Sequence, residues 1–168
     1  MSRGQVRFQL LGSPLAPGKT LLSVDLVDAA TMKDVDLSNE KGAVLFLSIV
    51  PSLDTPVCEE QTHYLREEGE NLPKEIRRIT VSRDTPFAQK RIAKEAKPTN
   101  LQYLSHYQEG AFGNATGLLM EKTMLLARSV VLVDKKGVVR YIQVVPEITH
   151  LPDMARAFQK AIELTKGK

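Results

Sequence analysis

The sequence predicts an α/β fold in which helices flank a central mixed β-sheet. Short apolar runs alternate with helical patterns along 168 residues, an order typical of a sheet covered by helices. Residues 43–50 form an almost wholly apolar run between Gly42 and Pro51. Such a run is typical of a strand buried on both faces near the centre of a parallel sheet. The length and the ordinary composition, 42% hydrophobic and 26% charged, predict one domain over residues 1–168.

The predicted strands are short segments that are apolar or alternate apolar with polar residues. In chain order they are residues 6–10, 23–27, 35–37, 43–50, 76–81, 101–104, 129–133 and 138–145. A tight turn ending at Gly137 joins the last two, which should therefore pair as an antiparallel hairpin. The Pro- and Gly-rich residues 12–19 are expected to form a loop. We expect a sheet that is parallel in its first half and closed by this hairpin.

The predicted helices are marked by residues that favour helix starts. They cover residues 56–68, 85–96, 111–116 and 152–165. Thr55 is a suitable N-cap, and Pro56 suits the first helical position. Thr85 and Pro86 repeat the pattern at the next helix. The last helix is amphipathic, which predicts that its apolar face packs on the sheet.

Charge and hydropathy exclude several classes of function. The formal net charge of +3 arises from 23 basic and 20 acidic residues, and these are interspersed, so we expect no nucleic-acid partner. The longest apolar stretch is too short to span a bilayer, and residues 1–7 show no signal-peptide pattern. With one cysteine no intramolecular disulfide can form, and the cytoplasm is the expected compartment.

Cys58, the one cysteine, is predicted at the third position of a helix. A helix N-terminus presents free amides and positive dipole charge, which favour the reactive thiolate. Free cysteines are often inert and buried, but the capping residue Thr55 so close by favours a reactive thiol. Glu59 and Glu60 oppose a thiolate, so a compensating cation is needed. Arg128 is a candidate, although an exposed position at the strand edge fits its sequence context equally well.

Other motifs are better explained without a function. Gly18-Lys19-Thr20 resembles the end of a phosphate-binding loop, but the spacing from Gly12 is wrong and the loop contains prolines, which lack amide donors. The three histidines match no spacing of metal ligands. We expect no metal site.

The sequence around Cys58 closely resembles the active-site motif of the bacterial thiol peroxidases, a branch of the peroxiredoxins. The motif covers residues 51–58, Pro-Ser-Leu-Asp-Thr-Pro-Val-Cys. Further matches follow in register at residues 82–91, 126–134 and 145–149. The resemblance covers nearly the whole chain, and its first motif is the most specific.

The resemblance implies a thioredoxin-like fold of the peroxiredoxin type, usually assembled as a homodimer. It implies reduction of hydrogen peroxide and alkyl hydroperoxides with no metal or organic cofactor. By position, Cys58 corresponds to the peroxidatic cysteine, and Thr55 to the threonine that bonds the thiolate and the peroxide. Arg128 corresponds to the arginine that stabilises the thiolate and orients substrate, and Pro51 to the proline that shields the pocket.

The chain departs from the family pattern in one important position. The resolving cysteine of the family usually follows the segment that matches residues 87–91, and Ala93 stands there in this sequence. Cys58 would therefore need an external thiol, either a small thiol or a thioredoxin-like protein. Residues 6–19 look shorter than usual, which implies a shortened N-terminal β-hairpin. Without a disulfide to form, we expect the helix around Cys58 to be more static than in other peroxiredoxins.

Three functional hypotheses follow from a lone thiol with this resemblance. The first is a one-cysteine peroxidase whose sulfenic acid is reduced by an external thiol. The second is a sensor or relay that passes oxidation to a partner protein as a mixed disulfide. The third is a binding or dimerisation module that has kept the fold without the activity, against which the retained pocket residues argue.

Overall fold

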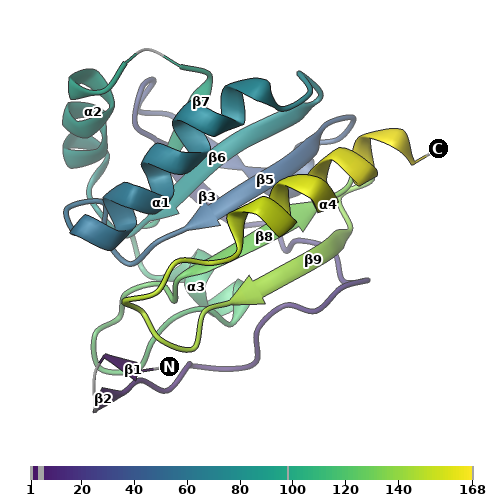
Figure 1. The fold of residues 1–168 in the computed structure, drawn as a ribbon. Helices are drawn as coiled ribbons and strands as arrows, with labels where there is room; N and C mark the ends of the chain where they lie inside the picture. Colours follow the sequence, from purple (N-terminus) through teal and green to yellow (C-terminus); the bar gives the residue numbers. More distant parts are fainter. Residues whose placement is uncertain (1, 4–5, 98, 168) are drawn as a thin grey trace.

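The computed structural model describes residues 2–3, 6–97 and 99–167. The described residues form a seven-stranded sheet with helices on both faces (Figure 1). In sheet order its strands are β4 (Asp34–Asp36), β3 (Asp25–Asp28), β7 (Leu101–Ser105), β6 (Ile76–Ser82), β5 (Val44–Ile49), β8 (Ser129–Val133) and β9 (Val139–Val144). The predicted α/β fold, with a central mixed sheet flanked by helices, is confirmed.

The pairing of the strands corrects one prediction. Strands β5, β6 and β7 are parallel, and β8 and β9 close the sheet as an antiparallel hairpin, as expected. However, β3 pairs antiparallel with both β4 and β7. The expectation of a parallel first half is therefore wrong for β3 and β4. These two strands are joined by a short turn, and such a connection permits only antiparallel pairing.

The helices begin close to where the sequence places them. They are α1 (Pro56–Glu67), α2 (Pro86–Glu95), α3 (Ala111–Thr116) and α4 (Met154–Lys166), with short 3-10 helices η1 (Leu37–Asn39) and η2 (Glu68–Asn71). Thr85 caps α2 by accepting a hydrogen bond from the amide of Ala88. Pro86 occupies the first turn of α2, as Pro56 does in α1.

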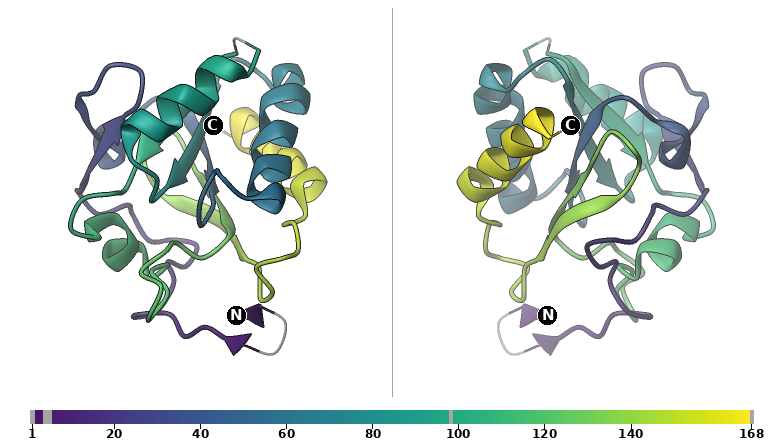
Figure 2. Two further views of the ribbon diagram at one scale, coloured as in Figure 1. Left: turned by 90° about the vertical axis from the view of Figure 1, so that its left-hand side faces the viewer. Right: turned by 90° about the vertical axis from the view of Figure 1, so that its right-hand side faces the viewer.

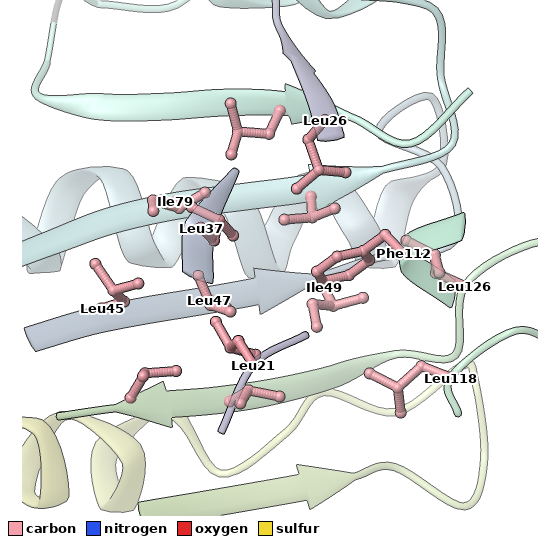
Figure 3. Packing of buried hydrophobic residues seen from close by; sticks show 14 of the residues in the cluster. Leu21, Leu26, Leu37, Leu45, Leu47, Ile49, Ile79, Phe112, Leu118 and Leu126 are labelled. Carbon is pink, nitrogen blue, oxygen red and sulfur yellow. The ribbon is translucent and has the colours of Figure 1, made fainter. Parts of the chain in front are cut away.

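Alternate residues of β5 divide the core into two layers. Leu45, Leu47 and Ile49 face a cluster that includes Phe112 of α3 (Figure 3). Phe46 and its neighbours on the other face pack against α1 and α4. Figure 2 shows α1 and α4 on one side of the sheet and α3 on the other. Every residue of β5 is buried, in agreement with the apolar run in the sequence.

The N-terminal residues form a small hairpin apart from the main sheet. Its strands β1 (Ser2–Arg3) and β2 (Val6–Arg7) pair antiparallel. Of the strand predicted over residues 6–10, only Val6–Arg7 forms a strand, and Leu10 makes an isolated bridge to Met120. In the described part of the chain, no helix is long and apolar enough to cross a membrane.

His106 is a buried, titratable side chain directly after β7. It is 3% exposed and its ring lies edge-on to Phe112, with Nε2 lacking a hydrogen-bond partner among the described residues. Burial, aided by the nearby cation of Arg83, lowers the pKa of His106 from 6.5 to about 4. Between pH 6.5 and about pH 4, His106 therefore binds a proton in the unfolded chain but not in the folded chain. The stability from this residue is present above pH 6.5 and is lost as the pH falls toward 4.

Acidification should destabilise the fold measurably through His106. From pH 7 to pH 5, this residue should lower the free energy of unfolding by about 2 kcal/mol, because one pKa unit corresponds to about 1.4 kcal/mol. Urea unfolding at both pH values should show this loss in the wild type and not in His106→Leu. The exposed residue His150 provides the control His150→Leu, which should keep the wild-type loss. Equal losses in wild type and His106→Leu would contradict the assignment.

Candidate active site

Cys58 lies at the start of α1, where the chain leaves the central strand β5. The loop after β5 leads to Thr55, and α1 begins at Pro56, which places Cys58 third in the helix, as predicted. The side chain is 1% exposed. Glu59 and Glu60 are exposed, so their carboxylates lie in solvent, where screening weakens their effect on the buried sulfur.

Arg128 is the cation that accompanies the sulfur. It is 2% exposed, and its Nη2 donates to Sγ of Cys58 at 3.2 Å. Its Nε donates to the carbonyl of Ile148 at 2.9 Å, and its Nη1 donates to Oε1 of Gln61 at 2.9 Å. The structure thus decides between the two readings of Arg128 left open by the sequence: it is a buried partner of Cys58. A charged donor fixed against sulfur can stabilise negative charge that develops on that atom during a reaction.

Gln61 is a site residue that the sequence analysis missed. It is fully buried on α1, one turn after Cys58. While its carbonyl accepts from Arg128, its Nε2 donates to Oγ of Ser48 at 2.9 Å. Gln61 therefore fixes the guanidinium of Arg128 relative to β5. The available signal was a polar residue three positions from Cys58, which places both side chains on one face of the helix.

Thr55 occupies the N-cap position of α1 without capping it. No side-chain capping bond forms, and the Thr55 hydroxyl donates to the carbonyl of Ser52 at 3.3 Å. The sequence predicted this position correctly, but the expected contact of the hydroxyl with the first turn is absent from the described structure.

Asp84, a second residue missed by the sequence analysis, holds the loop in front of Cys58. Its carboxylate accepts from Oγ of Ser52 at 2.7 Å and from the amide of Leu53 at 2.7 Å. It also accepts from Oγ of Ser82, at the end of β6, at 2.6 Å. These bonds tie the loop to the neighbouring parallel strand. We call this set of contacts the Asp84 clamp.

The four residues that the resemblance assigns to the site converge on one cavity of about 280 Å³. Its lining residues are Pro51, Ser52, Thr55, Pro56, Val57, Cys58, Leu125, Arg128, Ile148 and Thr149. Most of these side chains are apolar, and Arg128 alone among the described lining residues is charged. The cavity therefore joins a buried sulfur, a fixed cation and an apolar wall, which suits a small polar group carried on an apolar body.

Comparison with known proteins identifies the family. A family model described as Redoxin matches residues 16–158. The thiol peroxidase of Halalkalibacterium halodurans is 40% identical over 152 residues, which cover 90% of this chain and 85% of that protein. The chain belongs to the redoxin family. It is an enzyme of the peroxiredoxin type, as its thiol peroxidase relatives indicate.

Solved structures agree with this placement of the redoxin chain. A peroxiredoxin-like protein from Aquifex aeolicus superposes with a TM-score of 0.86 at 32% identity, over 94% of this chain and 92% of that one. The thiol peroxidase from Chromobacterium violaceum, at 20% identity, shares the fold with a TM-score of 0.80 over 98% and 95% of the two chains. The predicted thioredoxin-like fold of the peroxiredoxin type is confirmed.

Ala93 lies outside the cavity of Cys58 in this redoxin. It is partly buried on α2 and lines a different cavity of about 300 Å³, together with Tyr103 and residues of β3 and β7. His63 does not line the cavity of Cys58 either: its side chain is exposed and its ring contacts Arg66. Groups of three or more potential metal ligands are absent from the described residues.

Loss of Gln61 should destabilise the redoxin fold, because it leaves a buried guanidinium donor without a partner. We expect Gln61→Met to lower the free energy of unfolding by about 1–3 kcal/mol, the cost of an unpaired buried polar group. The control is Gln102→Met, since Gln102 also accepts from an arginine, Arg77, and donates to a second side chain, Asp28, but is only half-buried. Asp28 and Gln102 line a cavity that water can enter and so replace these bonds, and the control should therefore lose less in a urea titration. Equal losses would contradict the role of burial at Gln61.

Proposed function

We propose that this chain reduces hydrogen peroxide and alkyl hydroperoxides through a sulfenic acid on Cys58. The observation that carries the proposal is the contact between Nη2 of Arg128 and Sγ of Cys58, at 3.2 Å, inside a largely apolar cavity. A buried thiolate beside a fixed cation is a nucleophile, and the cavity has room for a hydroperoxide. The family membership and the match to thiol peroxidases support the same reaction class.

In the proposed reaction, the thiolate of Cys58 attacks the terminal oxygen of the peroxide. The S–O bond forms as the O–O bond breaks, and the other oxygen leaves as hydroxide or alkoxide and takes a proton from solvent. Sulfur is oxidised and the peroxide is reduced. Donors aimed at the departing oxygen accelerate such a step, because negative charge develops there. Arg128 is the donor already in place. Its bonds to Gln61 and to the carbonyl of Ile148 hold its guanidinium in a fixed position during the reaction.

Thr55 and Pro51 complete the proposed site. Both line the cavity of Cys58. The Thr55 hydroxyl holds only a long bond to Ser52, and rotation of its side chain would turn it toward the sulfur and the peroxide. Pro51 is buried and has no amide proton, so it shields the thiolate from water without competing for its hydrogen bonds.

Return to the thiolate requires a thiol from outside the chain, because the sequence has a single cysteine. The first external thiol condenses with the sulfenic acid to a mixed disulfide and water. A second thiol attacks the mixed disulfide and releases Cys58. We further propose that the enzyme acts as a cytoplasmic homodimer, in keeping with the family resemblance.

The reaction of Cys58 with peroxide should depend strongly on Arg128. We expect Arg128→Met to slow oxidation by about 100-fold, the effect of removing one donor to a developing anion. Arg128→Lys should fall between this variant and wild type, because it keeps the charge and loses the fork of donors. Stopped-flow mixing with hydrogen peroxide, followed by mass spectrometry, measures the rate and the product.

The matched control is Arg140→Met, since Arg140 lies on β9, is exposed and pairs with Asp134. It should react at the wild-type rate. The proposal fails if Cys58 in the wild type gains no oxygen at a stoichiometric amount of peroxide.

A further inference from the structure

We infer that a low-molecular-weight thiol, and not a protein thiol, regenerates Cys58, because the Asp84 clamp keeps this buried residue at the inner wall of a small cavity. This inference rests on the proposed function and names the class of its second substrate. The small thiol enters by the cavity that admits the peroxide. The Asp84 clamp acts as a positioning device that selects among reductants.

The burial of Cys58 sets the geometric requirement. A disulfide needs an S–S distance of about 2.05 Å and places the two Cα atoms roughly 4.4–6.8 Å apart. A protein thiol must therefore bring its own backbone within that range of Cys58. Cys58 is 1% exposed, and Pro51, Leu125 and Ile148 are among the residues that line the cavity beside it. A partner backbone meets these walls before its sulfur reaches Sγ.

The Asp84 clamp resists the movement that would admit a partner backbone. To expose Cys58, the loop in front of α1 must move away from the sheet. Asp84 holds that loop through Oγ of Ser52 and the amide of Leu53, and is itself held by Ser82. The carbonyl of Asp84 also accepts from the hydroxyl of Ser105 on β7. The loop is thus tied to two strands of the central sheet.

Arg128 adds a second restraint, on the helix side. Its guanidinium bonds Sγ of Cys58 and Oε1 of Gln61, so unwinding of the first turn of α1 breaks a buried charged contact. Leaving a buried donor without a partner costs free energy, and this cost opposes unwinding. In this chain no disulfide can compensate for unwinding, because Ala93 stands at the position of the resolving cysteine. Ala93 also lines a separate cavity.

A small thiol needs none of these movements. The cavity of about 280 Å³ is near the lower limit for small-molecule sites. The thiolate of the small molecule attacks the sulfur of the sulfenic acid, the S–O bond breaks, and the oxygen leaves as water after protonation. A second small thiol then attacks the mixed disulfide, so two thiols are oxidised to one disulfide for each peroxide reduced.

The inference is tested by reducing preformed sulfenic acid with thiols of increasing size. Wild-type protein is oxidised with one equivalent of hydrogen peroxide and mixed with 2-mercaptoethanol, cysteine, glutathione or reduced bacterial thioredoxin. Rates are expressed per thiolate, because thiolate is the attacking species. We expect 2-mercaptoethanol and cysteine to react at least about tenfold faster than thioredoxin, with glutathione between them, because a larger thiol needs local opening around Cys58 that a small thiol does not.

The Asp84 clamp is tested by Asp84→Ala and by the milder Ser52→Ala. Both should raise the thioredoxin rate, Asp84→Ala by about tenfold, and speed amide exchange of residues 52–55, because local opening becomes more frequent. The control is Asp134→Ala: this carboxylate also accepts from two amides and from an arginine, but lies beyond the far end of β8. It should leave both rates unchanged. If Asp84→Ala does not fold, Ser52→Ala carries the test.

The possible failures are distinct from one another. If wild-type Cys58 is not oxidised by peroxide, the proposed function fails. If it is oxidised, but thioredoxin regenerates it faster than the small thiols, the inference alone is overturned and a relay to proteins is favoured. If small thiols are faster but Asp84→Ala exchanges its loop amides more quickly without admitting thioredoxin, the role of the Asp84 clamp is overturned.

Discussion

The requirement that each nitrogen of a buried guanidinium have a hydrogen-bond partner organises the site of this protein. Arg128 is held by Cys58, Gln61 and the carbonyl of Ile148, which lie on α1 and on the segment after β9. A buried charge without partners is far more costly than any of these bonds is favourable. The helix, the strand and the late loop must therefore come together for the chain to fold. The same contacts leave one donor atom directed at the sulfur, so stability of the core and reactivity of the thiol share a single cause.

The antiparallel pairing of β8 with β5 brings that cation to the thiol. Ser129 at the start of β8 is opposite Ile49 at the end of β5. Arg128 therefore stands beside the loop in front of Cys58, although 70 positions separate the two residues. The parallel neighbour β6 ends at the same edge of the sheet and supplies the Asp84 clamp. The ends of these neighbouring strands at one edge of the sheet thus position sulfur, cation and loop.

Local sequence was sufficient to predict the parts of the structure that depend on local physics. The helix starts at Pro56 and Pro86 followed from capping and proline geometry, and the buried β5 followed from its apolar run. The antiparallel place of β3 beside β7 could not be predicted, because strand partners are chosen by tertiary packing. For the same reason Gln61 and Asp84 were missed: their functions lie in contacts with residues far away in sequence. Thr55 shows the converse, since a correct cap position did not determine where its hydroxyl would turn.

In the proposed reaction, the cavity over Cys58 makes the oxidised enzyme the object of a competition between two small molecules. Peroxide and reductant would both approach the sulfur through this cavity, so each would exclude the other while it is bound. A sulfenic acid that meets a second peroxide before a thiol advances to sulfinic acid, which most cells cannot reverse. The ratio of thiol to peroxide, more than the amount of either, would then decide whether a molecule turns over or is lost. A protein that works in this way would consume peroxide while thiols are plentiful, and its inactivated fraction would record each period when they were not.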